Sequence, residues 1–134
     1  MTATLELRTD GGVVLPADAD YDDARSVYNA MIDRRPAAIA RCRSVGDVQS
    51  ALAAGRRAGL AVAVRGGGHA GPGFGTVDGG LVIDLSPLAG IDVDPDARTA
   101  RVHGGATLAA LDAATHAHGL ATPGGVVGST GIGG

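Results

Sequence analysis

The feature that most constrains this chain is a glycine-dense stretch at residues 62–75, Val-Ala-Val-Arg-Gly-Gly-Gly-His-Ala-Gly-Pro-Gly-Phe-Gly. A β-branched run ends at Arg65, and a loop rich in glycine follows it. Because glycine has no Cβ, such a loop can turn sharply and direct several backbone N–H groups at one anion. His69 adds a nucleophilic imidazole nitrogen to that loop. The combination predicts a phosphate-bearing nucleotide cofactor and offers a nucleophile for a covalent bond to it.

The composition is that of one domain, or of part of a larger one. The chain has 134 residues, and 45% of them are hydrophobic, which is enough for a core. Glycine occurs 23 times, far above its usual share of about 7%. Because the glycines concentrate in residues 65–80 and 124–134, they indicate functional loops and not a uniformly disordered chain.

Charge and cysteine content exclude several classes of protein. The net charge of -3 does not favour binding to nucleic acid or to an anionic membrane. The single cysteine, Cys42, rules out an internal disulfide and a cysteine zinc cluster, and its apolar surroundings predict a buried small hydrophobe. The sequence shows no signal peptide and no run long enough to span a bilayer. We therefore expect a cytoplasmic protein with neither a nucleic-acid nor a membrane partner.

Hydrophobic periodicity predicts a series of short elements behind a loosely ordered lead at residues 1–20. The expected helices lie at 22–33, 44–59 and 106–118, and the expected strands at 37–42, 61–65, 81–85, 91–94 and 99–103. Ser44 and Asp47 form a capping-box-like helix start, and Gly59 is the expected C-terminal cap. The first two strands with the helix between them imply a βαβ unit with a parallel strand pair, and Pro95-Asp96 implies a hairpin between the last two strands.

The glycine loop also satisfies the pattern of a Rossmann dinucleotide-binding fingerprint. Residues 66–71 read G-x-G-x-x-G after a strand, and Asp84 lies near the position of the ribose-binding acid. That fingerprint must open a helix, whereas Pro72 and Gly73 follow almost at once. A Walker A loop is excluded because the chain has no lysine. The sequence therefore disfavours both of these nucleotide-binding motifs.

The tract from Arg34-Arg35-Pro36 through Arg65-Gly66-Gly67-Gly68-His69 to the glycine-rich end resembles a known family. It is similar to the first FAD-binding (PCMH-type) half of FAD-linked oxidases, in the berberine-bridge-enzyme-like branch of the vanillyl-alcohol oxidase family. The resemblance runs from about residue 21 to residue 134. It implies an α+β half-domain over residues 21–134, with a small parallel βαβ sheet followed by a mixed sheet and flanking helices. Since the family's domain continues further, we expect this chain to be an N-terminal part of it.

The resemblance also implies the residues of a cofactor site. The loop Gly66, Gly67, Gly68, His69 and Ala70 would hold the FAD pyrophosphate, with His69 bonded covalently to the flavin 8α-methyl carbon. Arg65 would either approach a phosphate or only form a salt bridge that holds the loop. The second cluster would supply N–H and hydroxyl donors to phosphate or flavin oxygens, and its members are Gly125, Gly128, Ser129, Thr130, Gly131 and Gly133. Val127 occupies the position of a second, cysteinyl flavin link in some members, so a single bond is expected.

The implied intact protein oxidises a small alcohol, sugar or related metabolite by hydride transfer to flavin, with O2 as the acceptor. The family's catalytic bases lie outside the matching tract, so we name no catalytic residue here. No metal site is expected, because His116 and His118 point about 200° apart on a helix; with His103 they are expected to be surface histidines. Two alternatives stay open: a non-catalytic nucleotide-binding module that never acquires FAD, and an interaction domain without a ligand.

Overall fold

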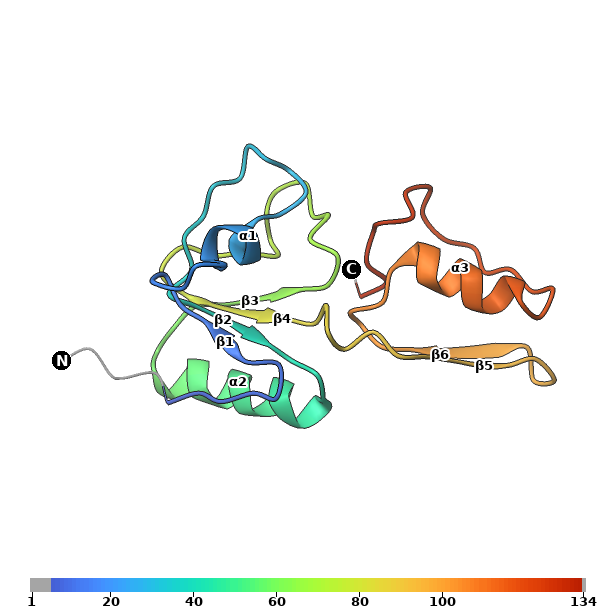
Figure 1. Cartoon of the computed structure of the whole chain (residues 1–134), viewed down its shortest axis with the longest axis horizontal. Helices are drawn as coiled ribbons and strands as arrows, with labels where there is room; N and C mark the ends of the chain where they lie inside the picture. Colours follow the sequence, from blue (N-terminus) through green and yellow to red (C-terminus); the bar gives the residue numbers. More distant parts are fainter. Residues whose placement is uncertain (1–5, 134) are drawn as a thin grey trace.

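The computed structural model describes residues 6–133, so the first five residues of the expected lead and Gly134 lie outside the described residues. The chain folds as two lobes joined side by side (Figure 1). The elements are β1 (Val13–Val14), α1 (Tyr21–Arg25), β2 (Ala38–Arg41), α2 (Val45–Arg57), β3 (Val62–Arg65), β4 (Leu81–Asp84), β5 (Ile91–Asp94), β6 (Thr99–Val102) and α3 (Leu108–His116). A four-stranded sheet with α1 and α2 forms the larger lobe, and the β5–β6 hairpin with α3 forms the smaller one. The expected α+β class is confirmed.

The sheet of the larger lobe has the order β1-β2-β4-β3, with β2, β4 and β3 parallel and β1 antiparallel at one edge. The expected direct pairing of β2 with β3 is therefore wrong, although the two strands do run in the same direction. All four residues of β4 are buried, and the centre of a parallel sheet is where a strand is covered on both faces. The most apolar strand takes that place.

One helix covers each face of this sheet (Figure 1). Tyr21 and Ala24 of α1 pack with Ile39 of β2 and Val82 of β4. The alternate strand residues point the other way, where they pack against Ala51 of α2; they are Ala38, Ala40, Leu81 and Ile83. The period-2 alternation of a strand thus gives the larger lobe two thin apolar layers built from small and branched side chains.

The expected helix at 22–33 is mostly wrong, because α1 ends at Arg25. Ser26 takes an extended conformation and its hydroxyl donates to the backbone oxygen of Asp22, 2.7 Å away. The Asn29 side chain then accepts from the backbone N–H of Met31 at 3.1 Å. Local side-chain bonds of this kind compete with helical hydrogen bonds, so residues 26–36 form a loop instead.

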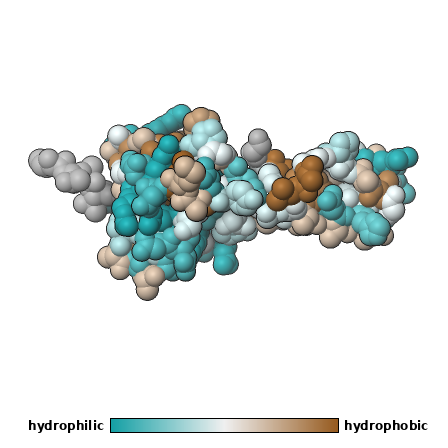
Figure 2. Space-filling model, turned by 90° about the horizontal axis from the view of Figure 1, so that it is seen from above, coloured by the Kyte–Doolittle hydropathy of each residue, from teal (hydrophilic) through white to brown (hydrophobic). Residues whose placement is uncertain are grey.

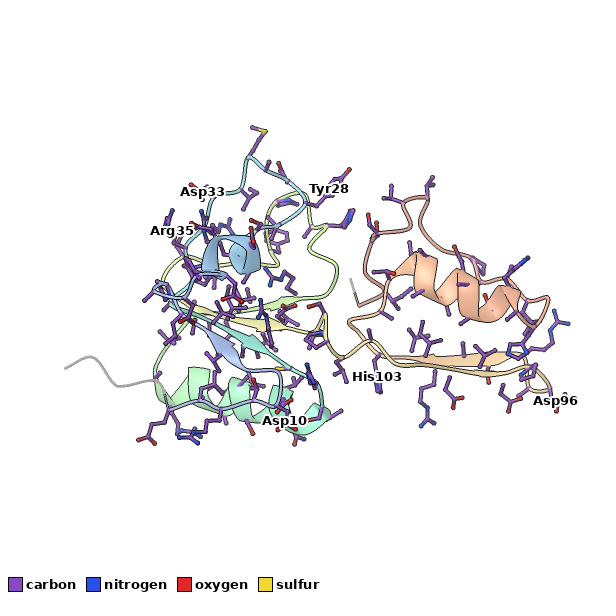
Figure 3. The ribbon with its side chains drawn as sticks, in the orientation of Figure 1. Asp10, Tyr28, Asp33, Arg35, Asp96 and His103 are labelled. Carbon is purple, nitrogen blue, oxygen red and sulfur yellow. The ribbon has the colours of Figure 1, made fainter. Side chains whose placement is uncertain are left out.

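The expected start of α2 is confirmed. Ser44 and Asp47 form a complete capping box, and Asp47 also accepts from the backbone N–H groups of Arg43 at 2.8 Å and Asp10 at 3.0 Å. The second of these bonds ties the N-terminal segment to α2 (Figure 3). The bonds from Arg43 and Asp10 hold the pKa of the Asp47 carboxyl below its usual range. Within the lead, Val13–Val14 form β1 on the edge of the sheet.

Cys42 is completely buried, as its apolar surroundings predict. Burial is the main cause that raises the pKa of its thiol to about 11, with the carboxylates of Asp47 and Asp84 adding to the effect. A thiol in this state stays protonated at neutral pH and is a poor nucleophile. Its role in the fold is packing.

The smaller lobe follows the expected order of hairpin and helix. The strands β5 and β6 pair antiparallel around residues 95–98, where Arg98 has a left-handed φ of 54°. The helix α3 begins after Thr107, whose side chain accepts from the backbone N–H of Ala110, and Gly119 follows it with a φ of +67°.

Hydrophobic side chains gather on the surface of the smaller lobe (Figure 2). No helix within residues 6–133 is long and apolar enough to cross a membrane.

The carboxylate of Asp47 predicts a specific pH dependence of stability. Its folded pKa lies below that of the unfolded chain, so it stabilises the fold fully above the unfolded value of about 3.9 and loses this effect as the pH falls through the folded value. Asp47→Asn should therefore lower the melting temperature at pH 6–8, and the deficit should shrink below about pH 4. Asp92→Asn, at an exposed position of β5, is the control. A deficit for Asp47→Asn that does not change with pH would contradict this account.

Candidate cofactor-binding site

The candidate site begins where two parallel strands end. Arg65 and Asp84 are paired residues at the carboxyl ends of β3 and β4, and the glycine loop leaves the sheet directly after Arg65. A cavity of about 440 Å³ lies over this edge. Its lining comes from residues 64–70, Phe74, Gly75, Leu85, Thr130, Gly131 and Gly133. Both glycine clusters singled out in the sequence thus contribute to one cavity.

The two clusters meet backbone to backbone at Gly67 and Gly131. A Cβ on Gly67 would lie 2.3 Å from the backbone nitrogen of Gly131, and a Cβ on Gly131 would lie 2.2 Å from that of Gly67. Real Cβ atoms do not approach other atoms so closely, so only glycine fits on either side. This contact joins the larger lobe to the segment that follows α3.

A third glycine, Gly104, completes the junction. A Cβ on Gly66 would lie 2.9 Å from the Gly104 carbonyl oxygen, and a Cβ on Gly133 would lie 2.5 Å from it. Gly104 follows β6 and was not singled out in the sequence. Three segments that are far apart in the chain therefore approach one another without side chains between them.

Hydrogen bonds fix the second cluster on the start of α3. The backbone N–H groups of Leu108 and Ala109 donate to the carbonyl oxygens of Thr130 and Gly128, each at 2.9 Å. Gly125 and Gly128 lie against the side chains of Leu108 and Ala109 and do not line the cavity. The first N–H groups of α3 are thus occupied, so the helix N-terminus is not the anion-binding element.

The loop after β3 has backbone N–H groups that no hydrogen bond within residues 6–133 uses. Within residues 6–133, the backbone N–H groups of residues 66–70 donate no hydrogen bond, and all five residues line the cavity. Gly68 has a φ of +71°, a left-handed conformation that lets the backbone turn between neighbouring N–H groups. Unpaired N–H groups in a glycine loop form an anion-binding concavity.

His69 is held at this cavity by the second cluster. Its Nε2 lies 3.0 Å from the Ser129 hydroxyl oxygen, and its Nδ1 lies 3.4 Å from that of Thr130. The ring of Tyr28 stacks on the imidazole, with centroids 4.0 Å apart and an interplanar angle of 19°. The hydroxyls expected to serve phosphate or flavin oxygens therefore contact the histidine here.

Arg65 forms a buried ion pair below the loop. Its Nη2 lies 3.1 Å from Asp84 Oδ2, and its Nη1 donates to the Ser26 carbonyl oxygen at 3.4 Å. Asp84 also accepts from the backbone N–H of Ser86 at 3.0 Å. Of the two roles the sequence left open, the structure shows the salt bridge, while Arg65 also belongs to the lining of the cavity. Removing one partner of such a pair typically costs about 3–5 kcal/mol.

Sequence reasoning missed several residues around the cavity. Val64 and Leu85 form apolar walls, and alternation along the strands could have placed them there. Phe74, the chain's single phenylalanine, lines the cavity while its side chain stays 74% exposed; an aromatic residue among glycines was the available signal. No sequence pattern indicated that Tyr28 lies near His69, because Tyr28 was expected to belong to a helix at residues 22–33.

The remaining histidines lie away from this cavity. His103 follows β6 near the junction of the lobes (Figure 3), whereas His116 and His118 lie at the end of α3, where both are exposed. Within residues 6–133, no group of three or more histidine, cysteine, aspartate or glutamate side chains lies close enough to hold a metal ion.

Comparison with known proteins identifies the family of this chain. The profile of a family described as FAD binding domain matches residues 36–134. The chain is 37% identical over 99 residues to (R)-6-hydroxynicotine oxidase of Paenarthrobacter nicotinovorans, covering 74% of this chain and 22% of that protein. It is 38% identical over 90 residues to glucooligosaccharide oxidase of Sarocladium strictum, covering 66% of this chain and 18% of that protein.

Solved structures give the same result. The crystal structure of 6-hydroxy-D-nicotine oxidase from Arthrobacter nicotinovorans matches with a TM-score of 0.93 and 34% identity, over 98% of this chain and 29% of that one. The BBE-like 1 protein of Physcomitrella patens matches with a TM-score of 0.82 and 30% identity, over 90% of this chain and 27% of that one.

The chain belongs to the FAD-binding domain family of FAD-linked oxidases. The resemblance drawn from Arg65 through His69 is thereby confirmed, as is the PCMH-type fold. The chain spans less than a third of the length of these relatives. Its residues fit FAD on two observations: within residues 6–133 the backbone N–H groups of residues 66–70 donate no hydrogen bond, and glycines of both clusters are part of the cavity's lining.

The contact between the clusters predicts different effects of alanine substitution at two glycines of one loop. Gly67→Ala should lower the free energy of unfolding by about 1–3 kcal/mol, because its Cβ meets backbone at 2.3 Å. It should also weaken FAD binding by moving the second cluster away. Gly71→Ala is the matched control, because nothing lies within 4 Å of a Cβ at that position. Chemical denaturation and FAD titration measure both effects, and equal stability of the two variants would refute the close contact.

Proposed function

We propose that this chain is the FAD-binding portion of a flavin-dependent oxidoreductase, and that it holds the flavin covalently through His69. The observation that carries the proposal is the position of His69 in the lining of a cavity that residues 66–70 also line, with backbone N–H groups that donate no hydrogen bond within residues 6–133. The family of the chain supports FAD as the ligand. A dinucleotide needs an anion site for its pyrophosphate, and a covalent link needs a nucleophile near the flavin ring.

Each group of this chain has a distinct task in the proposal. The N–H groups of residues 66–70 bind the pyrophosphate, and the ion pair of Arg65 with Asp84 holds the base of their loop. Val64, Phe74 and Leu85 provide apolar walls. FAD, when bound, supplies the redox chemistry by accepting a hydride from the substrate. The chain's share of the reaction is to bind and orient the cofactor.

The substrate in this proposal is a small alcohol, sugar or related metabolite, and O2 is the final acceptor. Relatives named for their reactions include a hydroxynicotine oxidase and a glucooligosaccharide oxidase. A structural relative from Myceliophthora thermophila C1 is a xylooligosaccharide oxidase in complex with xylobiose, with a TM-score of 0.83 and 28% identity, over 90% of this chain and 26% of that one. These names support small organic substrates and an oxidase reaction.

The proposed link joins a ring nitrogen of His69 to the 8α carbon of the flavin. Forming the N–C bond removes one hydrogen from the methyl carbon and one from the ring nitrogen. The two electrons released with these protons pass to O2, which becomes hydrogen peroxide. Val127 offers no sulfur for a second bond, so the proposal is a single histidyl link.

Acid precipitation after incubation with FAD tests the proposal directly. The wild-type chain should retain yellow flavin in the acid pellet, because a covalent bond survives denaturation. His69→Ala should release all of it into the supernatant while still binding FAD before acid is added. His118→Ala, an exposed histidine at the end of α3, is the control and should retain flavin.

Three outcomes would overturn parts of this proposal. Wild-type chain that binds FAD but releases it completely in acid would refute the covalent link and leave a non-covalent FAD site. Wild-type chain without affinity for FAD would refute cofactor binding by this chain and favour a non-catalytic module. Retention of flavin by His69→Ala would assign the link to another residue.

A further inference from the structure

The ring of Tyr28 is placed on His69 by two hydrogen bonds from its own segment to the backbone of the glycine loop. The backbone N–H of Tyr28 donates to the Gly68 carbonyl oxygen at 3.1 Å. The Asn29 side-chain nitrogen donates to the Gly71 carbonyl oxygen at 2.9 Å. These two acceptors flank His69 in the sequence. The segment after α1 is therefore fixed to both sides of the histidine before any side-chain stacking is considered.

The stack completes an enclosure of the imidazole. Tyr28 covers one face of the ring, with centroids 4.0 Å apart. The Ser129 and Thr130 hydroxyls contact the two ring nitrogens at 3.0 and 3.4 Å. The ring torsion of histidine is broad when nothing restrains it. Contacts on one face and at both nitrogens restrict it to a single plane.

The plane of the ring determines where a nucleophilic nitrogen points, because the lone pair of an imidazole nitrogen lies in that plane. Attack on a carbon requires the lone pair to be aimed at it at short range, and misplacement by about 1 Å costs on the order of 100-fold in rate. We propose that Tyr28 is a positioning residue that fixes the imidazole plane of His69 for bond formation to the flavin. This inference rests on the proposed covalent function.

The alternative is an ordinary exposed tyrosine on a surface loop. The other tyrosine, Tyr21, has a structural role in the core: it is 4% exposed, and its hydroxyl donates to the Pro36 carbonyl oxygen at 2.7 Å. Tyr28 is 69% exposed and belongs to neither core cluster. It lies at the edge of the larger lobe that faces the smaller lobe (Figure 3). Its described ring partner is His69.

The position of Tyr28 in the chain adds to this argument. The family profile matches residues 36–134, so the tyrosine lies outside the matched region while its partner His69 lies within it. The segment of residues 26–29 runs along the glycine loop. At one end the Ser26 carbonyl oxygen accepts a hydrogen bond from Arg65, and at the other the Asn29 side chain donates one to the Gly71 carbonyl oxygen. A segment that precedes the matched region thus supplies the tyrosine that covers one face of the His69 ring.

The first arm of the test needs no FAD. A tyrosine ring stacked on an imidazole shields the imidazole protons, so the His69 ring protons should resonate upfield in the wild-type chain. Tyr28→Leu should remove this shift, whereas Tyr28→Phe should keep it. NMR spectra of the purified chain measure the shift. Identical His69 chemical shifts in wild type and Tyr28→Leu would overturn the stack and leave the proposed function intact.

The second arm measures how fast covalent flavin forms. Tyr28→Leu should slow the appearance of acid-stable flavin by on the order of 10- to 100-fold, with little change in the dissociation constant for FAD before the bond forms. Tyr28→Phe should restore the rate to within about twofold, because the hydroxyl is not part of the stack. Met31→Ala is the matched control, because Met31 lies in the same segment with 90% of its surface exposed.

The outcomes separate this inference from the proposed function. A wild-type chain that links flavin, with Tyr28→Leu linking it at the same rate, would overturn the positioning role alone. Loss of FAD affinity and linkage together in Tyr28→Leu would instead assign the residue a purely structural role. A wild-type chain that never links flavin would overturn the covalent function and this inference with it.

Discussion

The contact between Gly67 and Gly131 is the constraint on which the rest of the site depends. Each glycine occupies the space that a Cβ on the other would need, with distances of 2.3 and 2.2 Å to backbone nitrogen. This approach brings Thr130 and Ser129 to the ring of His69. It also brings residues of both clusters into the lining of one cavity. A side chain at either glycine would separate His69 from the hydroxyls of Ser129 and Thr130.

Both lobes contribute to keeping this contact in place. On the larger lobe, the buried pair of Arg65 with Asp84 ties the end of β3 to the end of β4. On the smaller lobe, the first N–H groups of α3 bind the carbonyl oxygens of Thr130 and Gly128. The candidate site therefore lies between the two lobes, and within residues 6–133 neither lobe uses the backbone N–H groups of residues 66–70 as hydrogen-bond donors.

The sequence predicted most of the elements after residue 36, and it predicted their spatial neighbours less well. The helix after Ser44 and the hairpin around Pro95 followed from capping and turn residues, which act locally. The place of β4 between β2 and β3 did not, because strand order depends on the burial of whole strands. Both glycine clusters and His69 were found by pattern. Tyr28 and Gly104 were missed, because each acts through a contact with residues far away in the chain.

Backbone amide hydrogen exchange of the chain with and without FAD tests most directly whether the two glycine clusters form one binding site. FAD should slow exchange both in residues 66–70 and in residues 129–133, because both clusters line the same cavity. Exchange in the β5–β6 hairpin, which does not line that cavity, should stay unchanged. Bound FAD that protects only one cluster, or neither, would contradict the account.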